Sequence, residues 1–204
     1  ELFMGLTLGS FLALIGFAIY IISPKGLSNS KIDAIAWWFV FANIFNSAWI
    51  LLWHYLQFTL TLLPIFGLLV SLLVIYLKLK IGKEKRKWWE TLFVAAPFSI
   101  YLGWATVAVV ANVSQVLYNF GYRGVPLGET GFAVTLLGVA TLLGVLMIFL
   151  RKEVLYPLVL TWAFIGIWVK QSDYPIVSTT ALILGLVLAV LALGRWIWKL
   201  FKKS

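Results

Sequence analysis

The stretch FSIYLGWATVAVVANVSQVLY, residues 98–118, contains no charged residue and no histidine. At about 1.5 Å per residue, a helix of this length rises about 30 Å, which matches the hydrocarbon thickness of a bilayer. Similar apolar stretches recur along the chain, which is 63% hydrophobic and 11% charged, with a mean hydropathy of +1.02. Because soluble domains carry about 25% charged residues, the sequence predicts an all-α integral membrane protein.

Charge-poor windows predict a bundle of about seven transmembrane helices. Their ranges are 2–22, 34–55, 60–77, 98–118, 130–150, 154–169 and 176–194. Pro97 comes directly before the fourth range. Because proline removes a backbone donor and clashes with the preceding turn, we expect it to split a longer helical run. The part over 88–96 would then enter from the interface, and the span itself would begin at Phe98.

The basic residues test this count, because cytoplasmic loops carry an excess of Lys and Arg. Of the 16 Lys and Arg residues, all but Arg123 and Lys170 fall on one side of the predicted spans. We therefore expect a cytoplasmic C-terminus and residue 1 on the outer side. The net charge of +9 is then explained by topology and by contact with anionic lipids, worth about 1 kcal/mol per basic residue. No nucleic-acid partner is expected.

Several function classes are excluded by what the predicted spans lack. No Asp, Glu, Lys or Arg lies in the middle of a span, which argues against a proton pump or an ion-coupled transporter. The seventh span has no lysine for a retinal Schiff base, so the chain is not a rhodopsin. There is no cysteine, and therefore no disulfide and no cysteine metal site. No catalytic motif is visible, and we expect a protein that is not an enzyme and has no metal ligands.

Uncharged polar and aromatic residues form stripes on two spans. The stripe on the second span follows i, i+3, i+7 spacing and contains Asn46, Trp49 and Trp53. The stripe on the fourth span contains Tyr101, Trp104, Ala108, Asn112 and Gln115. Such spacing places side chains on one face of a helix. The amides then either bond between helices, at about 0.6 kcal/mol each, or orient a ligand in a cavity lined by indole faces.

Small residues at four-residue spacing mark other helix faces. They are Gly67 and Ser71, Ala140 and Gly144, and Ala181, Gly185 and Ala189. Small residues allow helix backbones to approach closely in a membrane. We interpret these faces as packing surfaces and assign no site to them.

The two stripes resemble the translocator protein family, also called tryptophan-rich sensory proteins or TspO/MBR. PFSIYLGWATVAVVAN, residues 97–112, is similar to the last core helix of that family. That helix carries a proline, then Tyr-Leu-x-Trp, with an alanine four residues after the tryptophan and an asparagine four residues later. NSAW, residues 46–49, resembles the Asn-x-x-Trp of the third core helix. The chain as a whole resembles a longer bacterial branch, which adds helices after the core.

The resemblance implies a domain organisation. Residues 1–119 would be the TspO-like core helices, and residues 120–204 would be three extra transmembrane helices with a basic cytoplasmic tail. The first core helix is missing from this pattern, because the opening ELFMGLTLGS has no Trp or Pro. Since the chain starts at Glu1 and not at Met, we expect either a missing N-terminal segment or a differently built wall. The implied location is a prokaryotic cell membrane.

The resemblance also implies a function. The protein would be a membrane receptor, sensor or carrier that binds a flat hydrophobic ligand, a porphyrin, other tetrapyrrole or sterol-like molecule, within the bundle. The implied ligand-binding residues are Asn46, Trp49, Trp53, Tyr101, Trp104, Ala108 and Asn112. Trp49 and Trp104 would stack on the ligand and approach one cavity from neighbouring helices. Asn46 and Asn112 would bond the ligand or each other, and Ala108 would leave room.

Two rival functions stay open from the sequence. One is an accessory or structural subunit of a larger membrane complex, in which His54 ligates a bound pigment or simply forms a hydrogen bond at the interface. The other is an enzyme acting on tetrapyrroles, for which no acid–base or metal constellation is visible. The expected partners are the lipid bilayer and a hydrophobic ligand, and a homodimer or a larger membrane assembly is left open.

Overall fold

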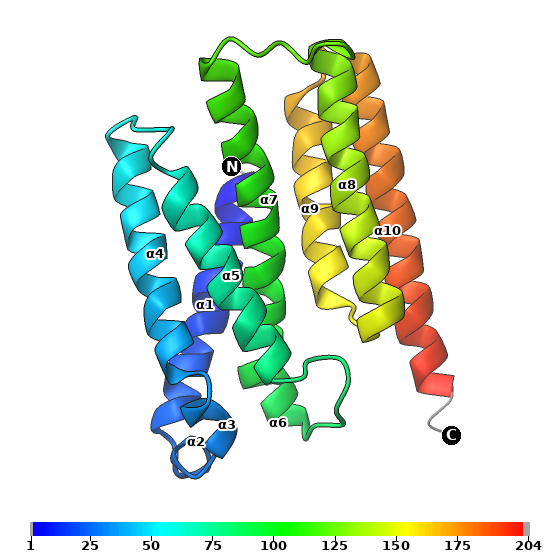
Figure 1. Cartoon of the computed structure of the whole chain (residues 1–204). Helices are drawn as coiled ribbons and strands as arrows, with labels where there is room; N and C mark the ends of the chain where they lie inside the picture. Colours follow the sequence, from blue (N-terminus) through cyan, green and yellow to red (C-terminus); the bar gives the residue numbers. More distant parts are fainter. Residues whose placement is uncertain (1, 202–204) are drawn as a thin grey trace. The chain divides into compact units, whose positions relative to one another are not determined.

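The computed structural model describes the backbone of residues 2–201 and the side chains of residues 12–199 and 201. Residue 1, which we expect on the outer side, and Lys202 and Lys203 of the basic tail lie outside the described residues. Residues 2–201 form helices joined by short connections, with no strand among them (Figure 1). The chain divides into two compact units, an N-terminal unit over Thr7–Phe120 and a C-terminal unit built on Gly121–Ser204.

The N-terminal unit is built from four long helices and several short ones. The long helices are α1 (Leu2–Ile22), α4 (Ala36–His54), α5 (Leu62–Lys78) and α7 (Ala96–Asn119). The short ones are α2 (Pro24–Leu27), α3 (Ser30–Asp33), α6 (Trp88–Glu90) and the π-helical turn η1 (Thr91–Ala95). Helix α5 packs against both α4 and α7 (Figure 1).

The core of the N-terminal unit contains three phenylalanine rings in mutual contact. The Phe17 ring on α1 lies 5.2 Å from Phe39 on α4 and 4.8 Å from Phe98 on α7, and Phe39 and Phe98 are 5.9 Å apart. All three contacts are edge-to-face, which aromatic rings prefer. Phe17 and Phe98 are fully buried. This phenylalanine cluster therefore joins α1, α4 and α7.

The C-terminal unit consists of α8 (Gly128–Arg151), α9 (Leu155–Lys170) and α10 (Pro175–Phe201), each packed against the other two. Its helices approach closely at small residues. A side-chain carbon added at Gly144 would lie 2.8 Å from Leu188 and 3.1 Å from Leu160. The Thr161 hydroxyl of α9 donates to the Gly185 carbonyl of α10 at 3.3 Å. Gly144 and Gly185, which the sequence predicts on packing faces, thus lie at contacts between helices.

Each of the seven predicted ranges coincides with a long helix, but fewer of these meet the requirements for a span. Four helical segments are long and apolar enough to cross a bilayer: Ala36–His54, Trp88–Asn119, Gly128–Arg151 and Pro175–Lys199. The remaining apolar helices, Leu12–Ile22, Leu62–Lys78 and Leu155–Lys170, are shorter within the described residues. The all-α fold with membrane-spanning helices is confirmed, while the number of seven spans stays a prediction.

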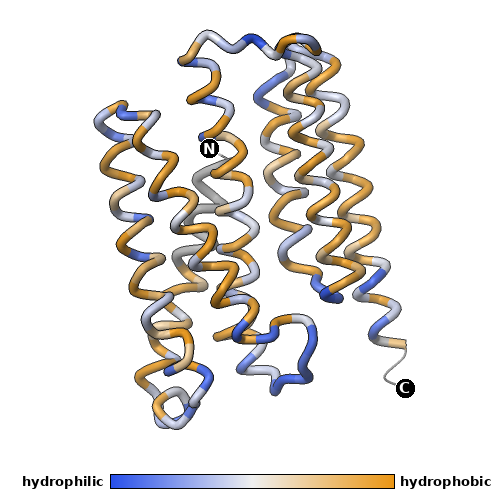
Figure 2. Tube along the Cα trace, viewed as in Figure 1, coloured by the Kyte–Doolittle hydropathy of each residue, from blue (hydrophilic) through white to orange (hydrophobic). Residues whose placement is uncertain are grey.

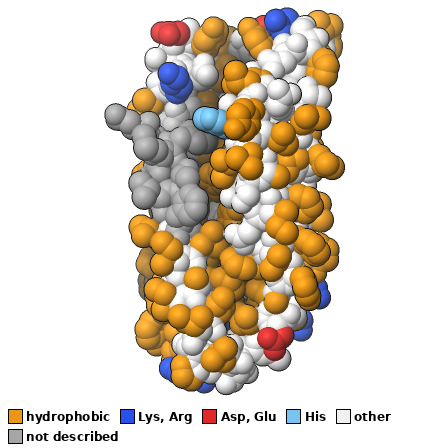
Figure 3. All heavy atoms as spheres, turned by 90° about the vertical axis from the view of Figure 1, so that its left-hand side faces the viewer, with side chains coloured by type: hydrophobic (Ala, Val, Ile, Leu, Met, Phe, Trp, Pro, Cys, Tyr) orange, Lys and Arg blue, Asp and Glu red, His pale blue; other side chains and the backbone are white. Residues whose placement is uncertain are grey.

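Polar and apolar residues are distributed as the membrane assignment requires. Apolar residues follow the middle of the helices, and hydrophilic residues gather in the loops and at helix ends (Figure 2). Among the described residues on the face shown in Figure 3, most side chains are hydrophobic, and the charged ones lie toward its top and bottom. Exposed apolar side chains such as Leu63 and Leu12 then face lipid rather than water.

The expected break at Pro97 is wrong. Helix α6, the π-turn η1 and helix α7 follow one another directly, so residues 88–119 form one helical run. In the turn before the proline, the Ala96 N–H bonds to the Thr91 carbonyl, five residues back. Proline has no backbone N–H and would leave a carbonyl of the preceding turn without a donor. A local π-helical turn accommodates the proline, because such a change in hydrogen bonding can provide another donor.

Candidate functional site

Four aromatic side chains of α4 and α7 form a continuous row, which we call the aromatic row: Trp53, Trp49, Trp104 and Tyr101. Ring centroids are 5.6 Å apart for Trp53 and Trp49, 5.7 Å for Trp49 and Trp104, and 5.9 Å for Trp104 and Tyr101. The middle contact links the two helices, with the indole planes at 86°. The spacing on each helix places its two rings on one face, and the structure brings the two faces together.

A chain of hydrogen bonds, which we call the amide relay, lies beside this row. The Trp49 indole Nε1–H donates to Asn112 Oδ1 at 2.7 Å. The Asn112 Nδ2 group donates to the Thr61 hydroxyl, also at 2.7 Å, and that hydroxyl donates to the Phe58 carbonyl. The relay therefore connects α4, α7 and the residue directly before α5.

The two parts of the site differ in burial. Asn112 and Thr61 are 1% and 0% exposed, so the relay is shielded from solvent and lipid. In such surroundings a hydrogen bond is stronger, and a missing partner costs more. The three indoles are only half-buried, which means that the aromatic row has an accessible side as well as a packed one.

The perpendicular packing limits how a flat ligand can bind. A planar molecule sandwiched between two rings needs about 7 Å between them, two van der Waals spacings. The Trp49 and Trp104 centroids are 5.7 Å apart, in edge-to-face contact. A ligand must therefore stack on the accessible side of the row or turn one indole away.

Five of the seven predicted site residues are brought together: Trp49, Trp53, Tyr101, Trp104 and Asn112. The other two, Asn46 and Ala108, are half-buried, and Asn46 has no hydrogen bond within the described residues. Asn112 bonds Trp49 and Thr61, and does not bond Asn46. Gln115 bonds Asn119 on its own helix at 3.1 Å. A binding role for each of these residues stays a prediction.

Sequence patterns did not indicate Thr61 or Phe58. Thr61 stands where α5 begins, and a threonine there is normally interpreted as a helix cap. Its hydroxyl instead accepts from Asn112. Phe58 lies in the connection between α4 and α5, and its ring is 5.0 Å from Trp53. The clustering of polar residues between the two spans was the only signal available.

The remaining candidates lie away from this site. His54 is exposed and its ring is 5.4 Å from that of Tyr55. Trp162 is 44% exposed on α9 although it lies in the middle of its helix. Within the part of the chain that the structure describes, no three His, Cys, Asp or Glu side chains are grouped so as to hold a metal ion.

Comparison with known proteins gives one match. A family model described as TSPO-like protein matches residues 10–194, which is most of the chain. Searches of the curated proteins and of the solved structures found no match.

Proposed function

The chain belongs to the TSPO-like family, and we propose that it binds a flat hydrophobic ligand on the aromatic row of its N-terminal unit, as a membrane receptor, sensor or carrier. The ligand class that we propose is a porphyrin, another tetrapyrrole or a sterol-like molecule. The observation that carries this proposal is the row of three half-buried indoles in contact across α4 and α7. No catalytic step is part of the proposed role.

The row offers what a flat apolar ligand requires. An accessible indole provides a large stacking surface, and such a contact contributes about 0.5–1.5 kcal/mol beyond area burial. The amide relay holds Trp49 by its N–H, and a ring held in one orientation loses less entropy when a ligand stacks on it. In this proposal Trp53 and Trp104 provide the stacking surface, and Asn112 positions Trp49.

Asn46 and Ala108 have a separate place in the proposal. Asn46 is half-buried and has no partner among the described residues, so its amide is available to bond a polar group of the ligand. Ala108 is half-buried on α7, one turn after Trp104. Its small side chain leaves space beside the row.

Titration of the detergent-purified protein with protoporphyrin tests this function. We expect saturable one-to-one quenching of tryptophan fluorescence. In the Trp104→Phe variant we expect an affinity lower by about twofold, because the smaller phenyl ring keeps only part of the stacking surface of the indole. The matched control is Trp168→Phe, because Trp168 is an exposed indole of α9 in the C-terminal unit. That variant should bind like the unchanged protein.

Two outcomes contradict the proposal. Quenching that does not saturate would mean non-specific partition into the micelle. Equal weakening in the Trp104→Phe and Trp168→Phe variants would mean that the aromatic row is not the site. Competition of bound protoporphyrin by a sterol would assign both ligand classes to one site.

A second function is favoured by one observation. Each donor of the amide relay already has an acceptor in the chain, as expected if the row serves packing in a subunit of a larger membrane complex. In that case the protein co-purifies with fixed partners from its native membrane, and the Trp104→Phe variant loses those partners without any change in porphyrin quenching.

We also propose the membrane orientation. Loop residues 79–87 carry five basic side chains, and the last turns of α10 carry Arg195 and Lys199, which favours a cytoplasmic C-terminus in a prokaryotic cell membrane. Because the chain has no cysteine, single introduced cysteines at Lys85 and at Arg123 can be labelled from one side of the membrane. Labelling of the Arg123 position alone from outside is the expected result.

A further inference from the structure

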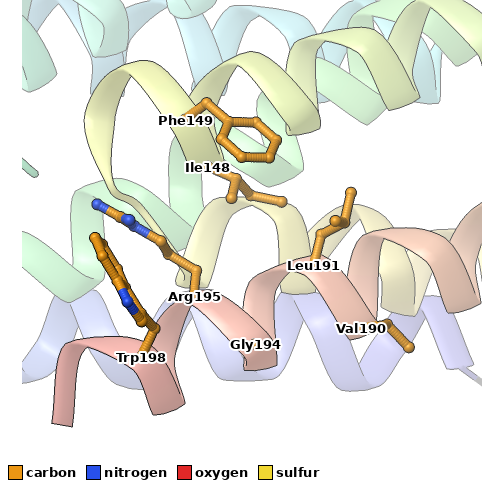
Figure 4. A pocket seen from close by; sticks show the side chains of 7 residues that line it. All are labelled: Ile148, Phe149, Val190, Leu191, Gly194, Arg195 and Trp198. Atoms are coloured by element: carbon orange, nitrogen blue, oxygen red, sulfur yellow. The ribbon is translucent and has the colours of Figure 1, made fainter. Parts of the chain in front are cut away.

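Helices α8 and α10 form an apolar groove in the C-terminal unit, separate from the aromatic row. The groove has a volume of about 390 Å³. Its walls include Ile148 and Phe149 of α8 and Leu191 of α10, while Gly194, Arg195 and Trp198 lie toward one end (Figure 4). We call this feature the α8/α10 groove.

One end of the groove is positively charged. The Arg195 guanidinium lies 4.6 Å from the centre of the Trp198 ring, and the two groups lie next to each other in Figure 4. The indole makes a cation–π contact with the guanidinium. Arg195 forms no ion pair with an acidic side chain within the described residues, so its charge is available to an anion.

The depth of the groove in the membrane follows from helix length. Helix α10 begins at Pro175, and Arg195 lies about 30 Å further along its axis at about 1.5 Å per residue. That distance equals the hydrocarbon thickness of a bilayer, about 30 Å. If Pro175 lies at one membrane surface, the guanidinium lies at the headgroup level of the other. Leu191, one turn earlier, then lies among the acyl chains.

The α8/α10 groove thus has the polarity of a phospholipid, with an apolar stretch facing the bilayer core and one cation at the headgroup level. We propose that it binds an anionic phospholipid, with one acyl chain along Phe149, Val190 and Leu191 and the phosphate on Arg195. A guanidinium matches phosphate because its planar N–H groups form two parallel hydrogen bonds. An anionic headgroup is favoured over a zwitterionic one because it has no cation of its own to oppose Arg195.

Gly194 gives a means of closing the groove. A side-chain carbon added there meets no atom within 4 Å, so a large side chain can extend into open space without displacing the helix. Gly138 of α8 has the same open surroundings and does not line the groove. Gly194→Trp and Gly138→Trp are therefore a matched pair, one of which blocks the proposed site.

The experiment uses the full chain, delipidated in a neutral detergent and titrated with phosphatidylglycerol or phosphatidylcholine, with bound lipids counted by native mass spectrometry. We expect one phosphatidylglycerol per chain, bound about tenfold more tightly than phosphatidylcholine, because the choline cation of the second lipid opposes the charge of Arg195. Arg195→Gln should remove that preference, and Gly194→Trp should remove the bound lipid. Gly138→Trp and Lys199→Gln should keep both.

Several results would overturn the inference. Equal affinity for the two lipids, or equal effects of Arg195→Gln and Lys199→Gln, would mean general surface attraction. Displacement of the lipid by inorganic phosphate alone would mean that the apolar wall plays no part. If the unchanged protein binds no lipid but forms a dimer, and the Gly194→Trp variant does not form that dimer, the groove binds a second copy of the chain. Circular dichroism of each variant confirms that it has folded.

Discussion

The two units of the chain hold their helices together in different ways. In the N-terminal unit, large rings and one amide fill the space between α1, α4, α5 and α7, as the aromatic row, the amide relay and the phenylalanine cluster show. In the C-terminal unit, helices touch at Gly144 and Gly185, where leucine and phenylalanine side chains of the neighbouring helices lie against the glycines. Packing by rings leaves half-buried indoles between α4 and α7, whereas at these two glycines the neighbouring helix lies directly against the glycine.

This difference explains where each proposed ligand binds. The N-terminal unit has its candidate site between helices, because indoles and amides lie there. The C-terminal unit has its candidate site on the outside of a packed helix pair, in the α8/α10 groove. The following substitutions test whether ring packing and glycine packing are the main sources of stability in their units.

The largest effect is expected from Phe98→Ala in the N-terminal unit. Phe98 is fully buried and contacts both Phe17 and Phe39. Truncation leaves a cavity in the phenylalanine cluster, and the expected loss is about 3 kcal/mol of unfolding free energy. Reversible unfolding by dodecyl sulfate in mixed micelles measures it. The control is Phe66→Ala on α5, which is 46% exposed; an equal loss there would mean that the cluster is not a special source of stability.

Glycine packing in the C-terminal unit is tested by Gly144→Leu. The new side chain collides with Leu188 and Leu160, and overpacking of this kind costs about 1–3 kcal/mol. The same unfolding measurement applies. Gly138→Leu on the same helix is the comparison, because its surroundings are open. If both variants lose the same stability, close approach at Gly144 does not hold α8 and α10 together.

A smaller effect is expected for the amide relay. A double-mutant cycle of Trp49→Phe and Asn112→Ala isolates the bond between the two side chains. We expect a coupling of about 0.6 kcal/mol, the average for hydrogen bonds between membrane helices. Asn43→Ala replaces Trp49→Phe in the control cycle, because Asn43 bonds only its own helix, at the Phe39 carbonyl. Coupling of similar size in both cycles would contradict a specific relay.

The smallest effect is expected at an exposed charge cluster of the N-terminal unit. Hydrogen bonds from Lys31 and Lys80 lower the pKa of the Glu84 carboxyl from 4.5 to about 2. Its contribution to stability is therefore present above pH 4.5 and is lost as the pH falls through about 2. The measurement is the difference in Tm between the unchanged protein and Glu84→Gln. We expect the difference in Tm to shrink toward zero as the pH falls from 4.5 to about 2. A constant difference between these pH values would mean that the ionised Glu84 carboxylate does not contribute to stability.

Helix positions were predictable because a segment crosses the membrane when its side chains transfer favourably from water to lipid. That transfer depends on the composition of the segment itself. The range 60–77 became Leu62–Lys78, and 154–169 became Leu155–Lys170. The faces of the stripes were predictable too, since the helical period places Trp49 and Trp53 on one side of α4. Whether two stripes then meet depends on how each helix is rotated about its axis, which no pattern within one helix determines.

The unpredicted features all depend on contacts between segments distant in sequence. Asn112 bonds Thr61, 51 positions earlier, and the choice of Thr61 over Asn46 as its partner follows from the packing of α5 on α7. The phenylalanine cluster draws one ring from each of three helices. Phenylalanine is so common in apolar spans that none of these three rings could be distinguished from those facing lipid.

The π-turn at Thr91–Ala95 affects the direction in which all later side chains of α7 point. A π-turn holds one residue more than an α-turn, and each residue of an α-helix turns the chain by about 100°. If the same residues wound as an ordinary α-helix, Trp104 and Asn112 would point about 100° further around the axis, away from α4. Deleting one residue of the turn would restore α-helical winding and leave their direction unchanged. The direction of the Trp104 and Asn112 side chains is thus determined by Thr91–Ala95, several residues earlier in the chain.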